Sequence, residues 1–171
     1  SVTDGNLVNG GAITGGGGVN VVDGNLTNNG SMVVGGTVET TNGSIVNNGA
    51  ITGAYGFETS SDASDPLFTK GADYSITNNG TITSPDGLEF YANASIGAAG
   101  NGSTGSFTNT GTLQFGVINP YLEAYANDNI SLGGKLQIVN GTTVKAVSAS
   151  NPLDYLELYA GGYYGNGSFT T

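Results

Sequence analysis

Apolar and polar residues follow each other along this chain in a phrase that recurs. The phrase is GSIVNNGAIT at residues 43–52, and close copies begin at residues 5, 24, 74 and 105. In each copy an apolar residue is followed by Asn two positions later, Gly four positions later and another apolar residue six positions later. A repeat of this kind decides the fold before any single residue does.

The spacing of the copies predicts short strands arranged in stacked coils. The first apolar residues are Leu7, Leu26, Ile45, Ile76 and Phe107, which are 19, 19, 31 and 31 residues apart. In the shortest copies the apolar positions lie 6, 6 and 7 residues apart, which is typical of three short strands joined by three corners. One coil cannot bury its own apolar side chains, but stacked coils can, with counterparts ~4.8 Å apart.

We therefore predict an all-β chain that forms one domain over residues 1–171. Its architecture is a three-sided parallel β-helix, a right-handed β-solenoid of about six coils of 19 to 31 residues, with an incomplete last coil. The longer coils carry 12 additional residues, which we place in corner loops because they are rich in Gly, Ser, Asn and Pro.

Three columns of inward side chains follow from this alignment. The first column contains Leu7, Leu26, Ile45, Ile76, Phe107, Ile138 and Phe169. The second contains Ile13, Met32, Ile51, Ile82, Leu113 and Val144, and the third contains Val19, Val38, Phe57, Leu88, Leu122 and Leu156.

The recurring Asn and Gly are predicted to form a corner. Each Asn can hydrogen-bond to its counterpart in the next coil, so we expect an Asn ladder of Asn9, Asn28, Asn47, Asn78, Asn109 and Asn140. The Gly that follows tolerates a positive φ or a close backbone approach. The sixth copy departs from this pattern because Thr142 stands in the place of Gly.

The composition of the chain excludes several classes of partner and of catalytic site. The net charge is −10, with three Lys and no Arg, so neither nucleic acid nor an anionic membrane surface is an expected partner. No apolar run is long enough for membrane insertion. His and Cys are absent, which excludes Ser-His and Cys-His nucleophile systems.

Glutamate residues form a further column. We expect Glu39, Glu58, Glu89, Glu123 and Glu157 to point outward, with Tyr91, Tyr125 and Tyr159 two residues later on the same face. One interpretation is a soluble strand face stabilised by stacked tyrosines. The other is a binding surface for cations, glycans, a host or cell-surface receptor, or a partner chain.

A cation would be Ca²⁺, held by Glu89 and Glu123 or by Asp62 and Asp65 in a corner loop; no cofactor is required. Neighbouring carboxylates ~5 Å apart repel by roughly 0.8 kcal/mol in water. We therefore expect raised pKa values in the folded state and a rise in stability on protonation or Ca²⁺ binding.

The chain is not expected to be an enzyme. A glycosidase needs one carboxyl with a raised pKa beside an ionised one, and a uniform row of glutamates offers no means of separating them. A polysaccharide-active enzyme is the most distant alternative.

The phrases GSIVNNGAIT and GNLTNNGSMV, 19 residues apart, resemble the β-helical repeats of filamentous haemagglutinin-type exoproteins. They are also similar to the passenger domains of bacterial autotransporters. The resemblance implies a β-solenoid at the cell surface or outside the cell, with a role in adhesion, biofilm structure or surface display.

Together these observations predict a non-enzymatic extracellular structural module. It would be the shaft or fibre of a bacterial surface adhesin, continuous with the rest of a longer surface protein, or a subunit that stacks end to end with copies of itself into a filament. A glycan- or receptor-binding module that uses the Glu and Tyr face is the alternative.

Overall fold

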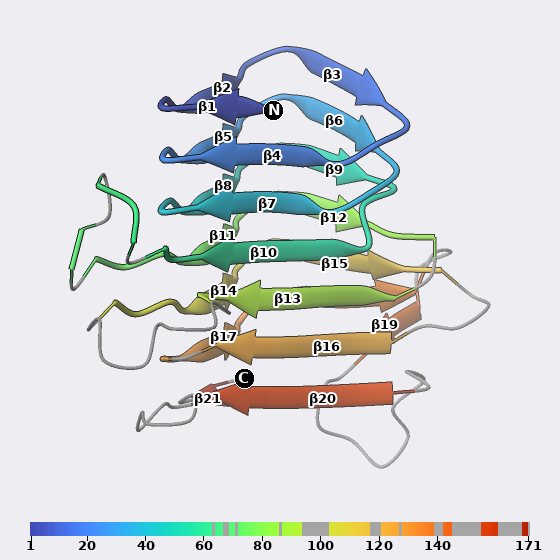
Figure 1. Ribbon diagram of the computed structural model, residues 1–171. Helices are drawn as coiled ribbons and strands as arrows, with labels where there is room; N and C mark the ends of the chain where they lie inside the picture. The colour runs from blue at the N-terminus through green and yellow to red at the C-terminus, as the bar shows by residue number, and fades with distance from the viewer. Residues whose placement is uncertain are drawn as a thin grey trace.

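The chain folds as stacked β-strands, and no helix is present among its described residues. The computed structural model describes residues 1–62, 64–66, 69–70, 72–85, 87–93, 103–116, 121–126, 128–138, 142–144, 155–160 and 169–170. Strands follow one another around three faces, and each turn of the chain lies below the preceding one (Figure 1).

The described strands form three sheets of seven strands each. Sheet A contains β1 (Val2–Thr3), β4 (Val19–Val22), β7 (Val38–Thr41), β10 (Gly56–Ser60), β13 (Leu88–Ala92), β16 (Tyr121–Ala126) and β20 (Tyr155–Ala160). Sheet B contains β2 (Leu7–Asn9), β5 (Leu26–Asn28), β8 (Ile45–Asn47), β11 (Ile76–Asn78), β14 (Phe107–Asn109), β17 (Ile130–Leu132) and β21 (Phe169–Thr170). Sheet C contains β3 (Ala12–Gly15), β6 (Ser31–Val34), β9 (Ala50–Thr52), β12 (Thr81–Thr83), β15 (Thr112–Phe115), β18 (Lys135–Ile138) and β19 (Thr142–Val144).

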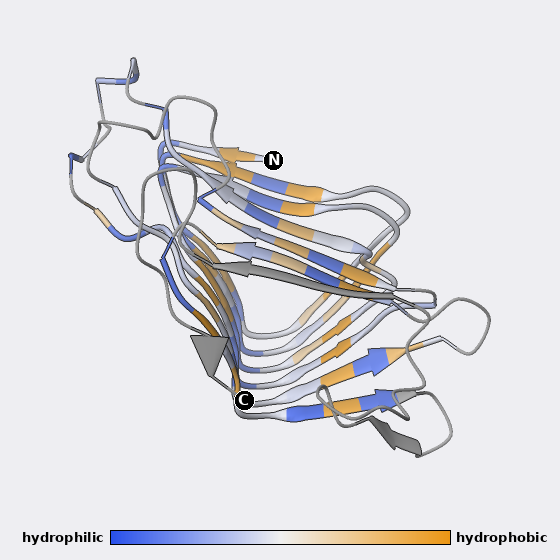
Figure 2. Cartoon of the chain, turned by 90° about the horizontal axis from the view of Figure 1, so that it is seen from below, coloured by the Kyte–Doolittle hydropathy of each residue, from blue (hydrophilic) through white to orange (hydrophobic). Residues whose placement is uncertain are grey.

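Neighbouring strands pair in parallel throughout the described sheets, except that β19 runs antiparallel to β18. The three-sided parallel β-helix of about six coils is thus confirmed. The view from below shows the three sheets meeting at corners (Figure 2). The described part of the long corner between β10 and β11 projects beyond the sheets (Figure 1).

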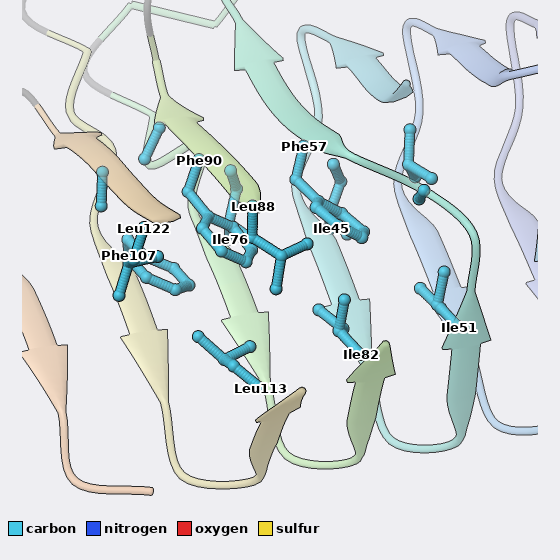
Figure 3. Packing of buried hydrophobic residues seen from close by; sticks show 14 of the residues in the cluster. Ile45, Ile51, Phe57, Ile76, Ile82, Leu88, Phe90, Phe107, Leu113 and Leu122 are labelled. Carbon is cyan, nitrogen blue, oxygen red and sulfur yellow. The ribbon is translucent and has the colours of Figure 1, made fainter. Parts of the chain in front are cut away.

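The predicted core columns of sheets B and C are confirmed for the first five coils. Leu7, Leu26, Ile45, Ile76 and Phe107 are register partners in sheet B. Ile13, Met32, Ile51, Ile82 and Leu113 are register partners in sheet C. From the second coil onward these side chains are buried (Figure 3), because alternation along each strand points them all into the interior.

In the sixth coil the predicted columns are wrong. The neighbour of Phe107 is Ile130, 23 residues later, and not Ile138, which pairs with Phe115 in sheet C. The neighbour of Leu113 is Leu136 and not Val144. Val144 lies one strand further, in the antiparallel β19, opposite Leu136. The sixth coil is shorter than the 31-residue step on which the prediction relied. Apolar residues happen to stand 31 residues after Phe107 and Leu113, and for that reason Ile138 and Val144 were assigned to the two columns.

Sheet A differs from the prediction by a register shift of two residues. Phe57 pairs with Phe90 and not with Leu88, whereas Leu88 pairs with Leu122 as expected. Two of the 12 additional residues therefore fall in the corner between β12 and β13 and not in the corner after β13. Leu88 and Phe90 are both buried, so the shift leaves the inward face apolar.

Aromatic side chains stack inside the middle coils, and a small side chain follows them in the next coil. Phe90 stacks on Phe57 with ring centroids 5.1 Å apart and on Phe107 with centroids 4.1 Å apart (Figure 3). Below Phe90, its register partner in the next coil is Ala124. The small side chain of Ala124 leaves room in that coil, where Phe107 and Phe115 are both fully buried, as close packing requires.

Candidate functional site

The corner between sheets B and C holds a buried ladder of asparagine side chains. Asn9 Nδ2 donates to Asn28 Oδ1 at 2.8 Å, and Asn28 Nδ2 donates to Asn47 Oδ1 at 2.8 Å. The same bond joins Asn47 to Asn78 and Asn78 to Asn109, at 2.7 Å each. The amides also donate to backbone carbonyls, as Asn28 does to Ala50. The predicted Asn ladder is thus confirmed for five of its members.

The ladder ends one coil earlier than predicted. The register partner of Asn109 in the next coil is Leu132. The shortened sixth coil places an apolar residue in this column, so the predicted sixth member is wrong for this position. Asn140 itself lies outside the described residues.

A second, exposed ladder runs beside the first and in the opposite direction. Asn48 donates to Asn29, Asn79 donates to Asn48, and Thr110 donates to Asn79, at 2.8, 2.9 and 2.8 Å. The buried amides therefore donate toward the C-terminal coils, and the exposed ones donate toward the N-terminal coils. The second Asn of each Asn-Asn pair was the signal for this ladder, and the sequence analysis did not use it.

The recurring glycines allow coils to approach each other closely. A Cβ on Gly30, Gly49, Gly80 or Gly111 would lie 2.0 to 2.1 Å from the carbonyl oxygen of the glycine one coil before, a separation that no side chain tolerates. Gly134 continues the column, with a corresponding distance of 2.2 Å. The glycine is therefore kept in the sixth coil, and the predicted substitution by Thr142 is wrong.

Left-handed backbone occurs elsewhere in the coil. The non-glycine residues with positive φ are, among those described, Asp4, Asp23, Asn42 and Asn93. They follow strands of sheet A, and Asn42 donates to Asp23 at 2.8 Å. Asn and Asp tolerate this conformation better than other side chains.

The glutamates form two runs and not the single column that was predicted. Glu39 pairs with Glu58, and Asn20 precedes them. The register shift then places Tyr91 beside Glu58, and Gly56 beside Glu89. From Glu89 the second run continues through Glu123 to Glu157.

The first run contains a carboxyl with a perturbed pKa. Burial raises the pKa of Glu58 above its ordinary value, and repulsion from Glu39 raises it further. The expected direction is confirmed for this residue, although desolvation is a larger cause than repulsion. The assumption of a uniform row is wrong, because the register places Glu58 beside Tyr91 and not beside Glu89.

Around the second run, tyrosines and glutamates are joined across the strands. Tyr91 Oη donates to Glu123 Oε1 at 2.8 Å, and Tyr121 Oη donates to Glu89 Oε1 at 2.8 Å. The rings of Tyr91 and Tyr125 stack with centroids 5.2 Å apart and planes 4° apart. We call these five residues the Tyr–Glu lattice. Burial raises the pKa of Tyr91 far above its ordinary value, with further contributions from the Glu123 hydrogen bond and nearby carboxylates.

The lattice has features that the sequence analysis missed. A Cβ on Gly87 would lie 2.1 Å from Cδ1 of Tyr121, so the Tyr121 ring lies directly on the Gly87 backbone. Tyr121 alternates with Glu123 and Tyr125, and this period of two was the available signal. The register of β20 continues the pattern, with Glu157 beside Glu123 and Tyr159 beside Tyr125.

The loop aspartates are engaged locally. Asp62 Oδ1 accepts hydrogen bonds from the Ser64 backbone amide at 2.9 Å and from its hydroxyl at 2.6 Å. These bonds lower the pKa of Asp62. Asp65 donates its backbone amide to the Asp62 carbonyl. Within the described residues, no three acidic, His or Cys side chains are grouped to hold a metal, and Ca²⁺ binding by Glu89 and Glu123 stays a prediction.

Charge is distributed unevenly over the three faces. All five Glu residues lie in strands of sheet A, whereas the charged residue in the described strands of sheets B and C is Lys135. The described part of the chain has no helix whose length and apolarity would suit a membrane crossing. Searches of protein-family models, curated proteins and solved structures found no match to this chain.

Proposed function

We propose that this chain is a non-enzymatic structural module, the shaft of an extracellular bacterial surface adhesin. One observation carries the proposal: the residues that repeat are those that join one coil to the next. The Asn ladder, the close-approach glycines and the buried columns all make contacts between coils. A repeat that is used for stacking favours a rod over a site that acts on a ligand.

The asparagine bonds make the stack stiff. The side chains of Asn28, Asn47 and Asn78 each bond to the coils on both sides, and a typical intramolecular hydrogen bond contributes about 1 kcal/mol. Because the polar groups are buried, a break between coils leaves them unpaired, which costs more than the bond itself. Such a rod suits a part that holds other parts at a distance.

The shaft is favoured over a filament of identical copies. Among the described residues the outermost strand of sheet C is β19, which runs antiparallel to β18, whereas the other described strand pairs of this sheet are parallel. In a head-to-tail stack of copies, β19 would have to pair with a strand of the next copy, and this junction would differ from the parallel contact that joins the coils within one chain.

Sedimentation and negative-stain electron microscopy of the purified chain, over a concentration and Ca²⁺ series, test this choice. The shaft predicts particles of one size at all concentrations. Threads of uniform width that lengthen with concentration would contradict it and support the filament. Tethering the chain by its two ends in a force spectrometer adds a positive readout, because a shaft unfolds coil by coil in regular steps.

The alternative is a glycan- or receptor-binding module, which the stacked Tyr91 and Tyr125 on an outer face favour. The lattice also limits this function, because stacking covers one ring face and Tyr91 donates its hydroxyl to Glu123. A glycan array decides the matter: binding that is lost in Tyr125→Ala and kept in Tyr55→Ala would favour the module. Tyr55 is a suitable control because it is 48% exposed and outside the lattice.

A polysaccharide-active enzyme is the third reading. The pair of carboxyls that most resembles a catalytic acid and base is Glu58 and Glu39, because the pKa of Glu58 is raised. Release of reducing ends from a polysaccharide panel, abolished by Glu58→Gln or by Ala at Glu89 or Glu123, would overturn the structural proposal.

A further inference from the structure

The outer face of sheet A holds two tyrosine rings in an arrangement that a shaft does not require. Tyr91 in β13 and Tyr125 in β16 are register partners on neighbouring strands. Their rings stack with centroids 5.2 Å apart and planes 4° apart. Because both side chains leave the sheet in register and lie nearly parallel, corresponding atoms of the two rings are adjacent. The rings therefore form a preorganised pair that spans two successive coils.

A hydrogen bond gives one ring of this pair an acceptor for its proton. Tyr91 Oη donates to Glu123 Oε1 at 2.8 Å. Burial raises the pKa of Tyr91 far above its ordinary value, and the Glu123 hydrogen bond raises it further, so the phenol stays protonated at neutral pH. Loss of one electron turns a phenol into a strong acid. An oxidised Tyr91 therefore passes its proton along the existing bond to Glu123.

Both rings are within reach of a small oxidant. Tyr91 and Tyr125 are half-buried, so part of each side chain contacts solvent. Tyr74, by comparison, is 5% exposed. Tyr55 is 48% exposed but lies outside the lattice, in the residue before β10. Exposure alone would favour oxidation of Tyr55, whereas the stacked geometry favours a reaction between Tyr91 and Tyr125.

We propose that Tyr91 and Tyr125 are a site of oxidative cross-linking, at which a carbon–carbon bond between the two rings joins successive coils. The oxidant is a one-electron oxidant of the peroxidase class, with hydrogen peroxide as the terminal electron acceptor. The chain has no Cys, and a bond between the rings would constrain the unfolded chain as a disulfide does. This inference goes beyond the proposed function and does not depend on it, because it concerns the chemistry of two side chains.

Atoms and electrons balance in the reaction. Each phenol gives up one electron and its hydroxyl proton, that of Tyr91 to Glu123 and that of Tyr125 to water at the outer face. The two phenoxyl radicals couple at the ring carbons next to the oxygens, after the side-chain torsions bring the rings together. The hydrogen on each of these carbons then moves as a proton to the oxygen, which restores both phenols. The electrons and protons released reduce one hydrogen peroxide to two water molecules.

Photo-oxidation of the folded chain with a ruthenium tris-bipyridine complex and persulfate tests the proposal. The reagent supplies a small one-electron oxidant, and a dilute solution keeps the molecules apart. Proteolysis and mass spectrometry identify the product. We expect a monomer that has lost two hydrogen atoms, shows dityrosine fluorescence and yields a peptide pair linked through Tyr91 and Tyr125. This pair should disappear in Tyr91→Phe and in Tyr125→Phe, and persist in Tyr55→Phe.

A second pair of variants tests the proton acceptor. Glu123→Gln should slow the formation of the linked peptide severalfold at neutral pH, because Tyr91 then has no carboxylate to take its proton. Glu89→Gln is the matched control, since Glu89 accepts a hydrogen bond from Tyr121 at 2.8 Å and not from Tyr91. It should keep the rate of the unmodified chain. Equal rates in the two variants would overturn the role of Glu123.

Oxidation in urea separates the folded geometry from intrinsic reactivity. The unfolded chain should give a mixture of tyrosine links with no preference for Tyr91 and Tyr125. An equal yield of this link in the folded and the unfolded chain would overturn the proposal, as would links that form only between molecules. A link from Tyr125 to Tyr159, its register partner in β20, in place of the link to Tyr91 would overturn the assignment of the pair.

Discussion

At the scale of single residues, the coil contact depends on side chains that are small or that bond in two directions. Asn47 is an example: its Oδ1 accepts from Asn28 and its Nδ2 donates to Asn78. An amide can make both bonds at once, and a carboxylate or an alkyl group cannot. The glycines two residues later have the opposite role, because what matters there is the absence of a Cβ.

The two ladders predict unequal effects of one substitution. Asn47→Ala leaves the side-chain Oδ1 of Asn78 without its donor in a buried position, and we expect a loss of about 2–4 kcal/mol in the free energy of unfolding. Asn48→Ala removes the neighbouring exposed amide, and we expect a loss below about 1 kcal/mol. Urea denaturation followed by circular dichroism measures both. Equal losses would mean that burial of the inner ladder contributes nothing.

Glu58 predicts a dependence of stability on pH. Its pKa is raised in the folded state, so the folded chain binds more protons than the unfolded chain between pH 4.5 and that raised value. Stability therefore rises as the pH falls through this window, and the benefit is complete below the unfolded pKa. Asp62, whose pKa is lowered, acts below 3.8 and in the opposite direction.

Removing the carboxylate tests the sign. Glu58→Gln should be more stable than the unmodified chain at pH 7, by no more than about 1 kcal/mol because the group is partly exposed to solvent. It should also lose the slope between pH 4.5 and 7 in melting temperatures recorded at low salt. Glu39→Gln is the matched control and should flatten the slope only in part, since desolvation is the larger cause. A slope that survives in Glu58→Gln would refute the assignment.

At the scale of strands, the sequence predicted the three sheets, the first five coils and the in-or-out direction of their side chains. It did not predict the register shift between β10 and β13. A shift of two residues leaves every inward residue inward, so the hydrophobic pattern of Leu88 and Phe90 fits either register. The same limit explains why Ile138 was assigned to sheet B and not to sheet C, because an apolar residue suits either sheet.

The candidate site depended on that register. The sequence placed the glutamates and tyrosines on the outer face of sheet A. The predicted single column of glutamates, however, gave no indication of the diagonal hydrogen bonds between tyrosines and glutamates. The ring of Tyr91 stacks on its register partner Tyr125, but its hydroxyl donates to Glu123, two residues earlier on the same strand. Such a bond follows from side-chain length and ring packing, which alternation along a strand does not specify.

The lattice predicts a coupled pair of residues. Tyr91→Phe keeps the ring stack and removes the hydroxyl that donates to Glu123, and we expect a loss of about 1 kcal/mol. In a double-mutant cycle with Glu123→Gln, the coupling energy should be about 0.5–1.5 kcal/mol. Spectrophotometric titration adds a second readout, because Glu123→Gln should lower the pKa of Tyr91 toward its ordinary value. A cycle with no coupling and an unchanged titration would contradict the bond.

At the scale of the whole molecule, stability is built from contacts between successive coils. Apart from the outermost strands and β18, each described strand pairs with the strands one coil before and one coil after, so the stack is close to one-dimensional. The contribution of a residue then depends on its type and on how many neighbouring coils cover it. Leu7 and Leu26 differ in this second respect, because they are register partners in one column with unequal burial.

The pair Leu7 and Leu26 tests this one-dimensional picture. Leu26→Ala empties a site with no exposed surface and should cost about 2–5 kcal/mol in the free energy of unfolding. Leu7→Ala removes the same atoms from a half-buried site, and we expect less than half of that cost, because part of the side chain already contacts water.

Urea denaturation at two protein concentrations gives both values. Equal costs would show that another coil covers Leu7 in solution, and a cost that grows with concentration would identify that coil as part of a second copy.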